Sequence, residues 1–355
     1  MHQKTLPRVL VLLRQRVYGD YSGCKTGLLN SATFVHDWLE KIGVPVQMLV
    51  VVDGNSIDRA VHEFQPTHCI IEAIWPTPDK MRELTKLHPT VLFVVRVHSE
   101  LGFLANEGMS IEWLRAYSDI PGVLVSFNSS HTRRDFAESE VVPYSAYLPN
   151  IYPAPRNPDW WFLLKKGVQK KLGIGGHYWC PASGRINVGL LGAIRPLKNG
   201  LQQAVAAIEV ADRLDVRLNL HINSGRVEQR GEPNLKNIRA LFAGTEHALV
   251  EHDWLGREEF LKLVSTMDAG LQVSFTESFS IVSADFVGQG VPVLGSPAVR
   301  WLPYASQASP IDGKDIANKL EQLLKYPGLF VGTQQNALIA HSRSAEREWR
   351  KFLEL

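Results

Sequence analysis

The sequence predicts an α/β protein of two domains, each with a parallel β-sheet covered by helices. Short apolar runs alternate with amphipathic stretches over residues 9–148, and the same alternation begins again at Ile186. This order is typical of parallel strands that are joined by helices. A proline-rich stretch separates the two series, and 355 residues are enough for two hydrophobic cores of ordinary size.

The first domain is predicted over residues 1–150. Between its first two strands, Phe34, Val35, Trp38 and Leu39 recur at helical spacing, and Gly43 then provides a helix stop signal. Six short apolar runs predict strands at residues 9–13, 46–52, 68–71, 91–97, 123–127 and 146–148.

Residues 151–185 are predicted to be a linker, because Pro153, Pro155 and Pro158 stiffen the chain and do not suit a central strand. The lysines at 165, 166, 170 and 171 are typical of a solvated helix face, with a phosphate contact as the alternative. The second domain is predicted over residues 186–335, with strands at 186–191, 217–222, 269–273 and 291–294 and with helices at 200–214 and 258–267. Residues 336–355 predict a charged terminal helix.

Composition excludes some classes of function. Lys plus Arg is 38 and Asp plus Glu is 36, so a net charge of +2 makes no strong electrostatic case for a nucleic-acid or membrane partner. Cys24, Cys69 and Cys180 are odd in number and widely spaced, which favours a reducing compartment, and we expect a cytoplasmic protein. The first apolar run is too short for a signal peptide or a membrane span.

The most informative segment is residues 274–293, SFTESFSIVSADFVGQGVPV. It predicts the end of a buried strand, a polar turn, a helix over residues 279–288 and a further strand. Glu277 then lies beside the helix N-terminus, and Asp285 lies about two turns along the helix. Because free N–H groups and the helix dipole attract anions there, one phosphorylated ligand can touch both acids and the helix end. The alternative is a capping acid with a solvated Asp285.

This segment, E-x-F-x-I-x-x-x-D, resembles the E-x7-E motif of the retaining family 4 glycosyltransferases, whose usual form is E-G-F-G-L-x-x-x-E before a G-x-P-V-V strand. The resemblance implies the GT-B architecture, in which two Rossmann-like domains face a central cleft. It also implies that Glu277 binds sugar hydroxyls, that the amides of Ser278, Phe279 and Ser280 hold a diphosphate, and that Asp285 holds the ribose diol. Two departures are that the second acid is Asp and that Ser278 and Ser280 stand in place of the family glycines.

A second candidate is the strand-to-helix turn GAIRPLKNG at residues 192–200. It resembles the G-R-L-x-x-x-K-G element of family 4, with Gly192 and Lys198 in place, Ala193 at the family arginine, and Arg195 two residues later. We expect Arg195 and Lys198 to neutralise the charge that grows on a departing diphosphate. A solvated basic turn is the alternative.

The acceptor side is predicted at the ends of the first-domain strands, because ligands of open parallel sheets bind outside the carboxyl ends. Arg96, His98 and Glu100 end one strand, Glu72 ends another, and Asn30 lies in the turn SGCKTGLLN after the first. His98 matches in position a histidine that family 4 enzymes often carry near the reacting sugar. Structural hydrogen bonding and turn or cap chemistry are the alternatives for these residues.

The sequence lacks D-x-D, H-E-x-x-H, G-x-x-x-x-G-K-[ST] and G-x-S-x-G motifs, so we expect no metal and no permanently bound cofactor. The leading hypothesis is a glycosyltransferase that moves a sugar from a UDP- or GDP-sugar to an acceptor hydroxyl. Retention of anomeric configuration is implied by the family resemblance. The residues expected to act in transfer are His98, Arg195, Lys198 and Glu277.

The acceptor stays open between a glycan, a small molecule and a modified DNA base. The segments NSATFVHDWL, IIEAIWPTP, RVHSELGFLANEG and FTESFSIV resemble soluble transferases of phage and bacterial genomes, which indicates a hydroxymethylated DNA base as one option. A non-catalytic nucleotide-sugar-binding protein and a sugar-nucleotide epimerase of the same fold are the other hypotheses.

Overall fold

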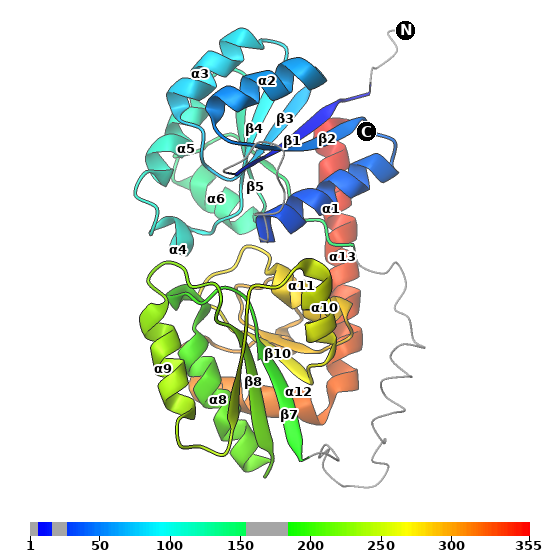
Figure 1. The fold of residues 1–355 in the computed structure, drawn as a ribbon. Coiled ribbons are helices and arrows are strands. Elements are labelled where there is room, and N and C mark those ends of the chain that lie inside the picture. Colours follow the sequence, from blue (N-terminus) through cyan, green and yellow to red (C-terminus); the bar gives the residue numbers. More distant parts are fainter. Residues whose placement is uncertain (1–5, 16–26, 154–183) are drawn as a thin grey trace. The chain divides into compact units, whose positions relative to one another are not determined.

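The computed structural model describes residues 6–15, 27–153 and 184–355, which belong to two compact units (Figure 1). The first unit comprises Met1–Pro153 and Ser342–Leu355, and the second comprises Ala154–His341. Most of the predicted linker, including the lysines at 165, 166, 170 and 171, lies outside the described residues. So does the turn that precedes Asn30, up to residue 26.

The first unit contains a six-stranded parallel sheet in the order β2-β1-β3-β4-β5-β6. The chain passes from β1 to its neighbour β2 and then returns to the other side of β1 for β3, so the order reverses at β1. The strands are β1 (Val9–Arg14), β2 (Val46–Val51), β3 (His68–Glu72), β4 (Leu92–Val97), β5 (Val123–Phe127) and β6 (Ser145–Tyr147). The helices are α1 (Gly27–Lys41), α2 (Gly54–Phe64), α3 (Pro78–Leu87), α4 (Leu101–Leu104), α5 (Ser110–Ser118) and α6 (Ser130–Glu138).

Helices cover both faces of this sheet. Side chains of α2, α3, α5 and α6 form one buried cluster with one face. Side chains of α1 pack on the other face together with Ala345, Trp349 and Leu353 of α13 (Pro327–Leu353). Trp349 is fully buried and donates from Nε1 to the carbonyl of Pro149 at 2.9 Å. The end of the chain therefore completes the core of the first unit.

The second unit contains a five-stranded parallel sheet in the order β11-β10-β7-β8-β9. Here the order reverses at β7, which lies between β8 and β10. The strands are β7 (Arg185–Leu190), β8 (Arg217–Asn223), β9 (Ala248–His252), β10 (Ala269–Gln272) and β11 (Val293–Gly295). The helices are α8 (Gly200–Arg213), α9 (Glu232–Phe242), α10 (Arg257–Ser265), α11 (Ile281–Gly288), α12 (Gly313–Lys325) and the first part of α13, with short 3₁₀ turns η1 (Pro196–Lys198) and η2 (Tyr304–Ser306).

On one face of the second sheet, α8, α9 and α12 share a large buried cluster with β7, β8 and β10. On the other face, Phe286 of α11 packs directly against the strands. A Cβ atom on Gly189 or Gly270 would approach the Phe286 ring to 2.6 or 2.7 Å, so only glycine allows this close approach. Helix α11 is thereby held against β7 and β10.

The predicted α/β class with two parallel sheets is confirmed. Each predicted strand matches an observed strand within about two residues, whereas β9, a short edge strand, was missed. The terminal helix begins at Pro327 and not at residue 336, and it contributes to both units. Within the described residues, no helix combines the length and the apolar character that a membrane crossing needs.

A histidine pair lies on β8 and β9. His221 and His252 stack with ring centroids 5.2 Å apart, and His221 Nδ1 lies 2.9 Å from His252 Nε2. His221 Nε2 lies 3.3 Å from Oδ1 of Asn187. Burial, reinforced by His252, lowers the pKa of His221 to about 4. The pKa of His252 is also lowered by burial.

We expect acid to destabilise the second unit through this pair. Between the folded pKa of about 4 and the ordinary value of 6.5, the unfolded state binds more protons at His221 than the folded state, so stability falls as the pH falls through this window. For a partly exposed ring the loss from pH 7 to pH 5 is about 1 to 2 kcal/mol. His221→Gln should remove most of this loss in urea unfolding, whereas the exposed control His62→Gln should not. An unchanged pH dependence in His221→Gln would contradict the assignment.

Candidate active site

The reversal of strand order at β7 brings two loops together at the carboxyl edge of the second sheet. One loop follows β7 and leads through η1 to α8, and the other follows β10 and leads to α11. The loops meet where Lys198 Nζ forms an ion pair with Glu277 Oε1. The sequence predicted both residues as functional, and the structure joins them although 79 residues separate them.

The Lys198–Glu277 pair is largely withdrawn from solvent, with side-chain exposures of 17% and 10%. Burial lowers the pKa of Lys198, and Arg195 adds to this effect, while Glu277 opposes it. The ammonium group thus depends on a nearby anion. Because a phosphate is such an anion, this position suits a ligand that can replace Glu277 as the counter-charge.

Hydrogen bonds hold the loop after β7 in shape. Gly192 has φ of +113°, a conformation that favours glycine, and its N–H donates to Oδ1 of Asn223 at 2.9 Å. Gln272 donates to the carbonyl of Leu191 at 2.8 Å, and Gln203 donates to the carbonyl of Lys198 at 2.7 Å. Gln203 also accepts from the N–H of Val273 at 2.7 Å. One glutamine side chain therefore ties the two loops to each other.

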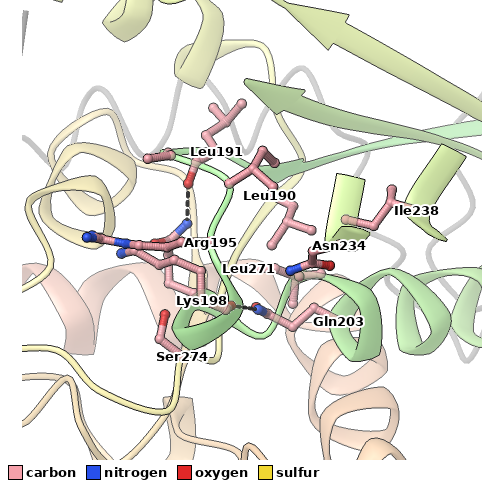
Figure 2. A pocket seen from close by; sticks show the side chains of 14 residues that line it. Leu190, Leu191, Arg195, Lys198, Gln203, Asn234, Ile238, Leu271 and Ser274 are labelled. Atoms are coloured by element: carbon pink, nitrogen blue, oxygen red, sulfur yellow. Dashed lines mark hydrogen bonds between the residues drawn. The ribbon is translucent and has the colours of Figure 1, made fainter. Parts of the chain in front are cut away.

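Behind this loop lies a small hollow, part of it open to solvent (Figure 2). Arg195 and Lys198 line it together with Asn234, Gln272 and Ser274. Among the described residues, Asn234 Oδ1, Gln272 Oε1 and Ser274 Oγ are buried and have no hydrogen-bond partner. Such acceptors are usually satisfied by water or by a ligand.

Arg195 belongs to a second charged group that the sequence did not reveal. Its guanidinium lies 3.6 Å from Oε2 of Glu228, and Glu228 also pairs with Arg226. Arg226 in turn stacks over the Trp254 ring at 4.5 Å. The backbone joins the same loops, because Ile194 donates to the carbonyl of Arg226 and accepts from Glu228, both at 2.9 Å.

The helix that the motif predicted begins at Ile281, two residues later than expected. Ser280 is its N-cap and adopts φ 62° and ψ 82°, a left-handed conformation that costs a non-glycine residue about 1 kcal/mol or more. The Ser280 hydroxyl accepts from the N–H of Ser283 at 3.4 Å. The side chain of Phe279 is buried and stacks on His341, so only its backbone remains for the predicted diphosphate contact. The diphosphate contacts of Ser278, Phe279 and Ser280 stay predictions.

Asp285, the second acid of the motif, is nearly buried, with 2% side-chain exposure. It accepts from the Arg257 guanidinium at 2.8 Å through Oδ1 and at 3.4 Å through Oδ2. Arg257 is the first residue of α10 and was missed, because the strand that precedes it, β9, was missed as well. The sequence of β9, ALVEH, contains no proline but combines apolar and charged residues in a short edge strand, so it carries little local signal for a strand.

In the first unit, Arg96 and Glu72 form a fully buried ion pair with contacts of 3.0 and 3.3 Å. Arg96 also donates to the carbonyl of Leu148 at 2.9 Å and to Asn150 at 2.7 Å, and it lies over the Trp349 ring at 5.3 Å. Both residues were expected to face an acceptor. The structure corrects this expectation. The side chains of Arg96 and Glu72 have no solvent exposure, so they lie beneath the surface at the strand ends and cannot contact an acceptor directly.

His98 is held by this buried ion pair, because its Nε2 is hydrogen-bonded to Oε2 of Glu72. Its Nδ1 lies 3.4 Å from Nδ2 of Asn128, which fits a ring that carries its proton on Nε2. Burial lowers the pKa of His98, Arg96 reinforces the effect, and Glu72 opposes it. For Glu72, burial raises the pKa but Arg96 and His98 more than compensate, so the pKa is lowered. At neutral pH a neutral imidazole therefore faces an ionised carboxylate.

The remaining acceptor-side candidates, Glu100 and Asn30, form no hydrogen bond with the Arg96–Glu72 ion pair in the described structure. Glu100 is nine-tenths buried, accepts from Thr132 at 2.5 Å through Oε2, and has no partner for Oε1 among the described residues. Asn30 lies on α1 and is partly buried, but it is the next residue, Ser31, whose hydroxyl joins the network by a 3.1 Å contact with Asn150. Within the described part of the chain, no group of three or more His, Cys, Asp or Glu side chains is placed to hold a metal ion.

The chain has the GT-B fold that solved glycosyltransferases share. Membership of family 4 in particular stays a prediction.

Similar solved structures cover nearly the whole chain. HepE of Anabaena, in complex with UDP and glucose, is 14% identical with a TM-score of 0.65, over 98% of this chain and 99% of that one. A UDP-forming α,α-trehalose-phosphate synthase of Burkholderia xenovorans, in complex with glucose-6-phosphate, is 12% identical with a TM-score of 0.68, over 98% and 100%. At such identities the likeness shows the fold alone. No protein-family model matches the sequence, and no curated protein matches it either.

Replacing Glu72 should destabilise the first unit strongly. Glu72→Gln leaves the Arg96 guanidinium buried without its counter-charge, which costs about 3 to 5 kcal/mol. Urea unfolding measures the loss. Glu63→Gln is the matched control, because the Arg59–Glu63 pair is exposed and contributes only about 0.5 kcal/mol. Equal effects of the two substitutions would contradict a buried, ionised pair.

Proposed function

We propose that this protein is a retaining glycosyltransferase that moves a sugar from a nucleotide diphosphate sugar to an acceptor hydroxyl. The observation that carries the proposal is the contact of Lys198 with Glu277 at the strand reversal of the second sheet, beside the N-terminus of α11. A lysine and a helix N-terminus suit a diphosphate, and a carboxylate next to them suits sugar hydroxyls.

In this proposal the ion pair opens when the donor binds. Lys198 exchanges Glu277 for a phosphate oxygen, and Glu277 becomes a hydrogen-bond acceptor for the sugar. Arg195, which Glu228 holds on the next loop, adds a second positive charge. These cations stabilise the leaving diphosphate as the glycosidic bond breaks. The backbone of residues 278–280 supplies N–H groups toward the same anion.

The first unit supplies the acceptor side. His98, neutral and fixed by Glu72, is proposed to lie near the transferring sugar, and Glu100 offers a further acceptor of hydrogen bonds. No protein nucleophile is assigned, because in a retaining reaction of this kind the acceptor hydroxyl attacks on the leaving-group face and a phosphate oxygen takes its proton. The similar trehalose-6-phosphate synthase transfers its sugar with retention, which supports the same stereochemistry here.

UDP-sugars are the donors to test first, because HepE holds UDP and the Burkholderia enzymes are UDP-forming. A glycan or a small molecule is the favoured acceptor class. On α6, Arg134 does not favour a DNA acceptor, because it lies 4.0 Å from Asp135 and 3.8 Å from Glu138.

The decisive experiment compares binding and turnover in two variants. We expect Lys198→Ala to weaken UDP binding about tenfold and to slow transfer about 100-fold, because a charge that stabilises the leaving group is lost. Glu277→Ala should bind free UDP at least as tightly as the wild type, since it frees Lys198, yet should lose the additional affinity for the sugar of UDP-glucose. Calorimetry measures the affinities, and release of UDP in the presence of an acceptor panel measures turnover.

Lys236→Ala, on the exposed side of α9, is the control and should change neither quantity. If no uridine or guanosine diphosphate binds, the proposed function is wrong. Binding without transfer or slow donor hydrolysis would favour the non-catalytic alternative. Conversion of the donor sugar without an acceptor would favour an epimerase.

A further inference from the structure

The second acid of the motif is not presented to a ligand in the way that its place in the sequence predicts. Asp285 lies in the second turn of α11, almost without solvent exposure, and both of its carboxylate oxygens face the Arg257 guanidinium at 2.8 and 3.4 Å. Arg257 itself keeps 26% side-chain exposure. Of the two partners, the arginine is the one that solvent or a ligand can reach.

The position of Arg257 suits a nucleotide whose phosphates lie at the start of α11. Asp285 follows Ile281 by four residues, so their separation along the helix axis is about 6 Å. This is on the order of the distance between a diphosphate and the ribose attached to it. Arg257 also opens α10 directly after the loop that follows β9, at the same carboxyl edge of the sheet.

We infer that Arg257, and not Asp285, makes the ribose contact of the donor nucleotide, and that Asp285 is the positioning residue that orients the guanidinium. This inference rests on the proposed function. Asp is one methylene shorter than the Glu usual in the motif, so its carboxylate stays within the protein and is satisfied by a bidentate arginine. A guanidinium offers only donors, in a planar fork. Arg257 therefore donates to ribose oxygens, where a carboxylate would accept from the ribose hydroxyls.

The test compares UDP with 2′-deoxy-UDP, in wild type and three variants, by calorimetry. We expect wild type to bind UDP about tenfold more tightly, which corresponds to one charge-assisted hydrogen bond to the 2′-oxygen. Arg257→Ala should bring this ratio close to one. Arg257→Gln, which can still bond Asp285, should do the same if the alanine variant folds poorly. Asp285→Asn should reduce the ratio but not abolish it, since Arg257 remains although it is less well oriented.

Arg239→Ala is the matched control, because Arg239 also binds a carboxylate through two bonds, to Glu251 at 2.8 and 2.7 Å, on another helix. It should leave the ratio unchanged. A ratio that survives in both Arg257 variants and vanishes in Asp285→Asn would overturn the inference and restore Asp285 as the ribose ligand. A wild-type ratio of one would also overturn it, while leaving the proposed function intact. Failure of both UDP and GDP to bind wild type would instead overturn the proposed function, and this inference with it.

Discussion

Parallel strand pairing is the constraint on which the rest of this structure depends. Because all strands of a unit point the same way, every strand-to-helix loop begins at one edge of its sheet. In the second unit the reversal of order at β7 then places the loops after β7 and β10 next to each other, and Lys198 meets Glu277 there. In the first unit the same rule groups Glu72, His98 and Asn128 at the ends of β3, β4 and β5.

The candidate site is organised as a set of ion pairs that join neighbouring loops or helices. Lys198 pairs with Glu277, Arg195 with Glu228, and Arg257 with Asp285. Each pair keeps a cation desolvated and in place without leaving it uncompensated, which would be costly in a partly buried site. At Lys198, a diphosphate that arrives can replace the Glu277 carboxylate at little electrostatic cost, because one counter-anion is exchanged for another. The ion pairs thus hold the cations in position in the absence of a ligand.

The first unit uses a buried pair in a different way. Arg96 and Glu72 are both inaccessible, and the further partners of Arg96 come from α1 and from the segment that follows β6. Arg96 holds the Glu72 carboxylate, and Glu72 is hydrogen-bonded to Nε2 of His98, whose pKa is lowered by burial. The sequence correctly indicated that polar residues gather at these strand ends. The sequence could not show which of these polar side chains are exposed and which are buried. Their burial depends on tertiary packing, since Trp349, from the far end of the chain, covers Arg96.

The sequence by itself determined the α/β class, most of the strands and the segments that carry charge at their ends. These follow from local apolar periods and from helix start and stop residues, which act over a few positions along the chain. It missed the edge strand β9, and with it Arg257, because a short strand with mixed polarity has no distinct local signal. Only the tertiary structure decided which charges pair, since Lys198 with Glu277 and Arg257 with Asp285 are 79 and 28 residues apart. Such partners are chosen by the order in which strands are placed in the sheet, and that order is a property of the packed core and not of any local segment.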